Sequence, residues 1–303
     1  MAELYPQVHS FQENKVISVS LMTDIKSMFF GKKERHCHVI SLYPKEPKAL
    51  DLMAVLNLII DWSKDVGLEP PDWMEFDAVN KKMGNPAPYK RAYDKLDKLD
   101  GIRDIEAILC NKALDGVDNR FVGWRWFVAL DRLRSLSVFV ECSVVAEFEH
   151  HAKQLIAAVG RIAPIQYGFE TVIPFSKGPY FYVNGTLYEG EKQYSRKEGE
   201  RLAKWNHALL ACRKTDSPVA EGYLRDVYEM NVLSESQLSI VIDGLKLSNW
   251  ITKNSSRGYL EVLNDKLCIW SVPEGSLNNL RRVLGQARLT VCYGGFETQS
   301  ATT

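Results

Sequence analysis

The strand-like segments of this chain follow one another in groups, with helical segments between the groups. Segments 105–110, 120–130 and 136–142 are rich in β-branched and aromatic residues, and they predict an antiparallel meander. Segments 15–22 and 35–43 predict a further antiparallel pair. Strict alternation of strand and helix, which a doubly wound parallel sheet requires, does not occur. The sequence therefore predicts an α+β fold with a mainly antiparallel sheet and flanking helices.

Local patterns predict the helices and hairpins around this sheet. Apolar residues at helical spacing favour helices over 49–67, 147–159 and 195–213. Two segments with a turn dipeptide between alternating runs, 179–188 with Asn-Gly and 259–272 with Asn-Asp, predict β-hairpins.

The length of the chain suits one large folding unit or two smaller ones. It has 303 residues, 46% of them hydrophobic, which is typical of a globular protein with a large core. Since domains are often about 150 residues long, we expect an N-terminal α+β half at 1–160 and a C-terminal α+β half at 161–293. The last residues, 294–303, predict a flexible tail. Two related halves and one continuous domain both fit the order of elements.

Charge and composition exclude several classes of partner. The 38 basic and 38 acidic residues balance, which argues against a nucleic-acid binder. The most apolar stretch, residues 50–62, contains two aspartates and is too short to span a membrane. The N-terminal residues lack the pattern of a signal peptide, and the six cysteines are scattered without a CxxC pair. These features predict a cytoplasmic protein with reduced thiols.

Motifs for catalysis and cofactor binding are missing from the sequence. It has no GxGxxG, GxxxxGK[ST], GxSxG or HExxH pattern, so we expect no cofactor and favour a non-enzymatic protein. His36 and His38 would share one face of a strand and are candidate metal ligands, although two ligands do not complete a site. Their alternative role is that of polar residues on an exposed face. A nucleophilic pair such as Cys142 with His150 has no sequence pattern behind it.

Aromatic residues supply the candidates for partner binding. Trp124 and Trp126 alternate on a predicted strand, as do Tyr180 and Tyr182 on the predicted Asn-Gly hairpin. If exposed, these side chains are of the types that anchor protein interfaces. The alternative is that helices cover them as part of the core.

Three strings in the second half carry a resemblance to a known group of proteins. They are GYLRDVYEMNVL at 222–233, RGYLE at 257–261 and LCIWSVP at 267–273. In the first, Arg225 and Asp226 predict an ion pair that holds the following segment in place. Over residues 164–285 the sequence resembles uncharacterised bacterial proteins that are similar to immunity proteins encoded beside secreted or polymorphic toxins.

The resemblance implies a function but no site residue. Proteins of this kind are α+β binding proteins that occlude the active site of a cognate toxin. We therefore expect a non-enzymatic, cytoplasmic bacterial protein whose partner is a cognate toxin. The alternatives are a metal-dependent enzyme that uses His36 and His38, and a structural subunit of a larger bacterial assembly.

Overall fold

The structure, a computed structural model, describes most of the chain beyond its N-terminal segment. The described residues are 34–46, 51–78, 81–82, 87–98, 105–110, 124–131, 135–187, 194–215 and 223–294. Contacts divide the chain into Met1–Glu34 and Arg35–Thr303, and every element named below lies in the second unit. The predicted strand at 15–22 and the predicted tail beyond Gly294 lie outside the described residues.

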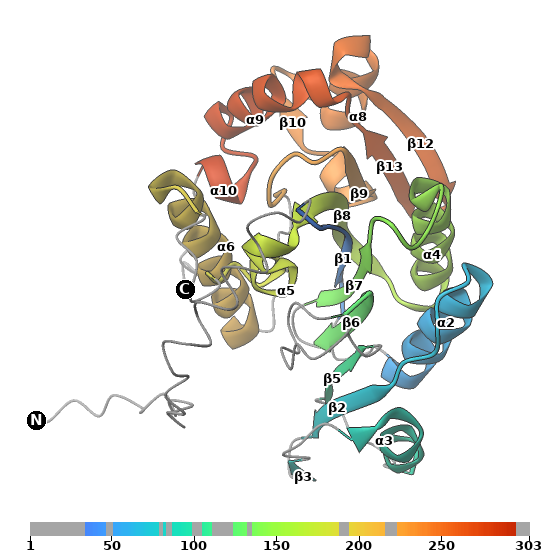
Figure 1. Cartoon of the computed structure of the whole chain (residues 1–303). Coiled ribbons are helices and arrows are strands. Elements are labelled where there is room, and N and C mark those ends of the chain that lie inside the picture. The colour runs from blue at the N-terminus through green and yellow to red at the C-terminus, as the bar shows by residue number, and fades with distance from the viewer. Residues whose placement is uncertain are drawn as a thin grey trace, which may run out of the picture. The chain divides into compact units, whose positions relative to one another are not determined.

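An antiparallel sheet of 11 strands forms the centre of the Arg35–Thr303 unit (Figure 1). Its strand order is β12-β13-β9-β8-β1-β7-β6-β5-β2-β3, with β4 also paired to β2. The strands are β1 (His36–Pro44), β2 (Trp73–Ala78), β3 (Lys81–Lys82), β4 (Ala87–Pro88), β5 (Ile105–Cys110), β6 (Trp126–Asp131), β7 (Ser135–Glu141), β8 (Ile165–Pro174), β9 (Met230–Ser234), β12 (Tyr259–Asn264) and β13 (Leu267–Ser271). A separate hairpin joins β10 (Val241–Ile242) and β11 (Leu245–Lys246).

Helices cover both faces of this sheet. On one face lie α2 (Leu52–Asp65), α3 (Tyr89–Leu96) and α4 (Phe148–Ile162), which share one hydrophobic cluster with the strands. On the other lie α5 (Pro179–Val183), α6 (Arg196–Thr215), α8 (Leu247–Thr252), α9 (Leu277–Gln286) and α10 (Val291–Gly294), which share a second cluster. A further short helix, α7 (Glu235–Leu238), follows β9. Figure 1 shows α2 and α4 on the opposite side of the strands from α5 and α6.

Strand β1 shows why the sheet is buried on both sides. Val39 and Tyr43 point into the cluster beneath α5 and α6, whereas Ile40 and Leu42 point into the cluster beneath α2 and α4. All four are at most 2% exposed. Because successive strand residues face opposite sides, a sheet covered on both faces requires apolar residues at nearly every position. This explains why Val39–Tyr43 of β1 is apolar except for Ser41, which is hydrogen-bonded to Ser137 at 3.0 Å.

The predicted α+β class and much of its local order are confirmed. The predicted meander appears as β5, β6 and β7, paired in that order. The predicted strand at 35–43 is β1, and the predicted hairpin at 259–272 is β12 and β13. The helix predicted at 195–213 is α6, and its start is capped as expected, since Ser195 and Glu198 exchange hydrogen bonds of 2.8 and 3.3 Å.

The sheet continues across the predicted boundary between residues 160 and 161. Strand β1, from the first predicted half, pairs along its length with β8, from the second. In the pairing, Val39 lies opposite Thr171 on one side and opposite Phe139 of β7 on the other. The two predicted halves therefore share one sheet, and their division into separate folding units stays a prediction.

The Asn-Gly hairpin predicted at 179–188 is wrong. Residues 179–183 form α5, which begins with Pro179 in its first turn and ends at Asn184. The Asn184 side chain donates to the Tyr180 carbonyl at 3.0 Å, and Gly185 adopts a positive φ of 67°. A Cβ at Gly185 would lie 2.6 Å from the backbone nitrogen of Asn206 in α6. The Asn-Gly pair thus ends a helix pressed against α6, a tertiary contact that the local pattern cannot reveal.

No helix in the described part of the chain is long and apolar enough to cross a bilayer.

Candidate functional site

The two tryptophans predicted as partner contacts belong to the core. Trp124 and Trp126 are 1% and 0% exposed, and they lie in the clusters on opposite faces of the sheet. The Trp124 ring packs 4.7 Å from the ring of Phe175, whereas Trp126 Nε1 donates to the carbonyl of Glu69 at 2.8 Å. The prediction that they face one side is wrong, because β6 begins only at Trp126 and the chain bends at residue 125. Because both side chains are buried, neither can be an exposed anchor for a partner.

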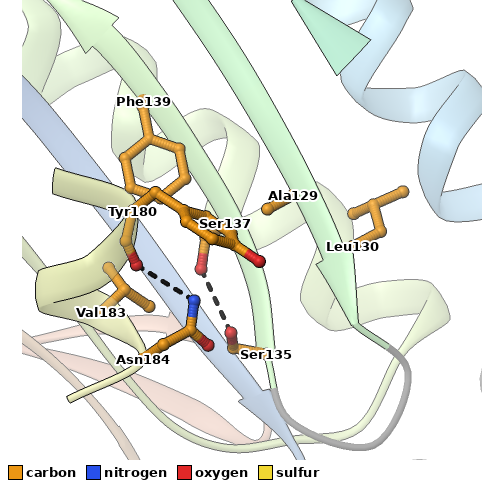
Figure 2. Close-up of a pocket in the computed structure, with 8 residues that line it drawn as sticks. All are labelled: Ala129, Leu130, Ser135, Ser137, Phe139, Tyr180, Val183 and Asn184. Atoms are coloured by element: carbon orange, nitrogen blue, oxygen red, sulfur yellow. Dashed lines mark hydrogen bonds between the residues drawn. The ribbon is translucent and has the colours of Figure 1, made fainter. Parts of the chain in front are cut away.

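The two tyrosines predicted as partner contacts lie on α5, half-buried. Tyr180 lines a small pocket between α5 and strands β6 and β7, closed in by Phe139, Ser137 and Asn184 (Figure 2). Its cavity of about 10 Å³ has room for roughly one water molecule. The Tyr182 hydroxyl lies 3.2 Å from that of Tyr228. A contact of Tyr180 and Tyr182 with a partner thus stays a prediction. Much of each ring is already packed within the protein.

His36 and His38 share one face of β1, but their surroundings differ. His36 is exposed, whereas His38 is stacked on the ring of Phe148 in α4 at 4.1 Å. The Nδ1 atom of His38 lies 2.9 Å from Oε1 of Glu170 in β8. Among the described residues, no group of three or more histidine, cysteine, aspartate or glutamate side chains could hold a metal ion.

A cysteine that the sequence did not connect with His38 completes a polar cluster. The Cys142 N–H donates to the carbonyl of His36 at 3.0 Å, which places the Cys142 side chain on the same face of the sheet as His38. Burial lowers the pKa of His38, but its interactions with Cys142 and Glu170 outweigh this effect and raise that pKa to about 9. We call Cys142, His38 and Glu170 the thiol cluster. His150, the partner considered from the sequence, lies on the exposed side of α4 and contacts Gln154 instead.

Strand β12 forms one end of the large sheet, with an apolar outer edge. No described strand pairs with its outer side, and its sequence YLEVLN carries a single charge. Tyr259 is 55% and Val262 75% exposed. At the opposite end, the edge of β2 pairs with two strands of two residues each, β3 and β4. Short strands are a common protection of a sheet edge, so β12 is the longer and less protected edge.

The one charged residue of β12, Glu261, forms an ion pair with α4. Lys153 of α4 lies between Glu261 and Glu149, at 2.8 and 3.0 Å from their carboxylate oxygens. Edge strands often carry charged side chains that prevent pairing with another chain. This ion pair holds Glu261 against α4, and the exposed side chains of Tyr259 and Val262 lie on opposite faces of β12. We call the outer side of Tyr259–Asn264 the β12 edge.

The hairpin turn holds β12 in a fixed register. Asn264 accepts hydrogen bonds from the backbone N–H groups of Lys266 and Leu267 at 2.9 and 3.0 Å. In the resulting pairing, Leu260 of β12 lies opposite the buried Trp270 of β13. The β12 edge is thus a preformed strand backed by the core.

Two open grooves lie beside α3. One of about 300 Å³ lies between α2 and α3 and includes Asn57, Tyr89 and Tyr93. The Tyr93 hydroxyl donates to Asn57 Oδ1 at 2.6 Å across it. Such shallow hollows differ from the enclosed, largely apolar pockets that small-molecule ligands usually occupy.

Comparison with known proteins gives a likeness of fold. No protein-family model matches the sequence, and no curated protein matches it. Among solved structures, the Pseudomonas aeruginosa T6SS protein PA0821 is similar with a TM-score of 0.50 at 10% sequence identity, over 92% of this chain and 86% of that one. At this identity the match indicates the fold and nothing further.

A second solved structure scores lower. It is the toxic C-terminal tip of CdiA from Pseudomonas aeruginosa in complex with immune protein, with a TM-score of 0.25 at 7% identity over 54% of this chain and 98% of that one. A score this low is no basis for an argument. The likeness of fold thus rests on the T6SS protein alone of these two structures, and it extends over most of the length of both chains.

Proposed function

We propose that this protein binds a toxin protein and neutralises it by covering its active site, as an immunity protein does. The observation that carries the proposal is the β12 edge, a preformed strand whose outer side pairs with no other described strand and whose Tyr259 and Val262 are exposed. The resemblance of segment 164–285 to immunity-like proteins supports the toxin as partner. The fold likeness to the T6SS protein PA0821 agrees with this choice.

The chemistry of the β12 edge suits an extended strand of the partner. An edge strand offers a row of backbone N–H and C=O groups, and a partner strand satisfies them by extending the sheet. Tyr259 and Val262 add apolar contacts, and a tyrosine is among the residue types most often found at binding hot spots. Steric occlusion needs no catalytic group on this chain, only a tight and specific fit.

Growth rescue tests the function. Each toxic protein encoded beside the gene for this chain is expressed in a sensitive bacterium, with and without this protein. We expect growth to be restored with one of them, and a stoichiometric complex of the two purified proteins in size-exclusion chromatography. Absence of both rescue and complex for every such toxin would overturn the proposal.

A pair of matched variants tests the surface. Val262→Glu places a charge on the β12 edge, where it opposes pairing with another strand. Val241→Glu is the control, because Val241 is also a strand residue and 64% exposed but lies in the separate β10–β11 hairpin. Both changes should leave the free energy of unfolding within about 0.5 kcal/mol of its value, as exposed substitutions do. We expect rescue to be lost with Val262→Glu and kept with Val241→Glu; rescue by both would mean that the partner binds elsewhere.

A further inference from the structure

Helix α3 carries an exposed, basic surface at the opposite end of the sheet from the β12 edge. The helix packs beside β2 and buries Ala92 and Leu96 in the same cluster as α2 and α4. Figure 1 shows α3 beside β2, away from β12. Because one side of the helix is held in the core, its other side is a preformed surface for a partner.

Four basic side chains line the open groove of about 470 Å³ on this surface. They are Lys90, Arg91, Lys95 and Lys98, and among the described residues that line the groove Asp94 is the single acidic one. Arg91, Lys95 and Lys98 follow one another at spacings of four and three residues, so they lie along one side of α3 and of the turn after it. We call the four basic residues the α3 basic surface.

Most of this positive charge is not neutralised within the described part of the protein. Lys90, Arg91 and Lys98 are exposed, and none of them forms an ion pair with another described residue. By contrast, Lys64 beside the neighbouring groove pairs with Asp61 at 2.8 Å. Like charges gathered on one surface repel one another, and a partner of opposite charge relieves that repulsion. The α3 basic surface therefore complements an acidic partner.

A second groove, of about 300 Å³, continues this surface. Lys90 lines both grooves, so they meet at this residue. The second groove is lined by the rings of Tyr89, Tyr93, Pro70 and Pro71, among others. Grooves lined by aromatic rings are typical binding sites of extended, proline-containing peptides. A ligand that passes Lys90 thus meets positive charge on one side and apolar rings on the other.

This mixture of surfaces favours a peptide over a nucleic acid. A phosphate backbone is a continuous row of negative charge, which Asp94 in the middle of the groove would repel. The rings of Tyr89 and Tyr93 lie 5.6 Å apart and pack on each other, whereas a base needs an open ring face. The distance along the helix from Arg91 to Lys98 is about 10 Å, which about three residues of an extended chain cover.

We propose that the α3 basic surface is a docking site for an extended, acidic, proline-containing segment of a partner protein. The carboxylates of the segment lie against Lys90, Arg91 and Lys98, and a proline enters the groove beside Tyr89 and Tyr93. The site goes beyond the proposed neutralisation of a toxin, since it uses neither the β12 edge nor any residue near it. Because its charges are exposed, the affinity of the site falls as salt is added.

A synthetic peptide is the probe for the test. It has about 12 residues of alternating glutamate and proline, which is long enough to cross both grooves, and it carries a fluorescent label. The full-length protein is titrated into it, and binding is followed by fluorescence anisotropy. We expect at least about tenfold weaker binding of the matching lysine–proline peptide, and a tenfold or greater loss of affinity between about 0.05 and 0.5 M NaCl.

Two further probes test the class of partner. A glutamate–serine peptide of the same length keeps the charge but removes the prolines, and it should bind at least about threefold more weakly. A single-stranded oligothymidylate of about 12 nucleotides should also bind more weakly than the glutamate–proline peptide. Equal or tighter binding of either probe would overturn the proposal.

Matched double variants test the surface. Lys90→Glu combined with Arg91→Glu should weaken binding of the glutamate–proline peptide by at least about tenfold. Lys253→Glu combined with Lys266→Glu is the control, because both lysines are exposed, lie outside the two grooves and change the net charge by the same amount. The control, and the β12-edge variant Val262→Glu, should stay within about twofold of the original affinity. Circular dichroism checks that each variant is folded, and equal weakening by the two double variants would overturn the proposal.

Discussion

Arg225 illustrates how a charge is accommodated in the core without the partner that its sequence neighbour suggests. It is 1% exposed and donates to the carbonyl oxygens of Val183 and Tyr182 at 3.1 and 2.5 Å. Its guanidinium also lies 4.4 Å from the centre of the Tyr182 ring, a favourable cation–π distance. Asp226 forms its ion pair with Arg281 instead, at 3.4 Å. The predicted Arg225–Asp226 pair is therefore replaced by two separate links, of which the Arg225 contacts tie the α5 segment to the chain before β9.

Protonation of His38 should make stability depend on pH. Its pKa is raised from 6.5 to about 9 in the folded protein. A raised pKa means that the folded state binds the proton more tightly than the unfolded state does, so the stabilisation is complete below about pH 6.5 and is lost as the pH rises to about 9. The groups that face the imidazole are Glu170 from β8 and Cys142 after β7, with the uncharged Phe148 from α4.

The expected loss is measurable by urea unfolding. Between pH 6.5 and 9 the free energy of unfolding should fall by about 1–3 kcal/mol through this group. The slope of the free energy of unfolding against pH should be flatter in His38→Gln than in the unchanged protein. An equal slope in both would show that His38 does not retain its proton in the folded state.

Local elements were predicted where a few neighbouring residues decide them. The β12–β13 hairpin and the capped start of α6 each depend on residues within one turn of the chain. The thiol cluster could not be predicted, because His38 and Glu170 are 132 residues apart and meet only through strand pairing. The same limit applies to Trp124, whose side of the sheet depends on a bend just before β6. The periodicity of a sequence does not show at which residue a strand begins.

The start of β12 depends on a glycine. Gly258 has a φ of 93°, and a Cβ there would collide with the carbonyl oxygen of Ser271 in β13 and lie 3.2 Å from Trp270 Nε1. Gly258→Ala should therefore lower the free energy of unfolding by about 2 kcal/mol or more, measured by urea unfolding. It should also weaken partner binding, since it displaces the first residue of the β12 edge.

Gly275→Ala is the matched control for that change. Nothing lies within 4 Å of a Cβ at Gly275, so its free energy of unfolding should stay within about 0.5 kcal/mol of the original. Equal effects of the two substitutions would mean that the backbone at Gly258 relaxes without cost.

At the scale of the whole molecule, the sheet joins the two predicted halves through β1 and β8. Each half taken alone would leave one of these strands without its partner, although both lie in the middle of the sheet. A central strand has apolar residues on both faces and a full row of backbone groups to satisfy. The arrangement favours a single folding unit from Arg35 onward over two independent halves.

Separate expression of 1–160 and 161–303 tests this expectation. We expect neither fragment to show a cooperative urea transition by circular dichroism, and the intact chain to show one transition. A fragment that unfolds cooperatively by itself would instead support the division at residue 160. Near-ultraviolet spectra of each fragment would show whether its tryptophans are packed as in the intact chain.

The strand order also determines when each strand can pair while the chain is synthesised on the ribosome. Strand β1 is made early, yet its two neighbours, β7 and β8, follow only after residues 135 and 165. At about 5–20 residues per second, this early strand waits on the order of ten seconds for its last neighbour. Strands β12 and β13, in contrast, are made together and add to an existing sheet. The strand proposed to meet the toxin is thus made after every other described strand of the sheet except its partner β13.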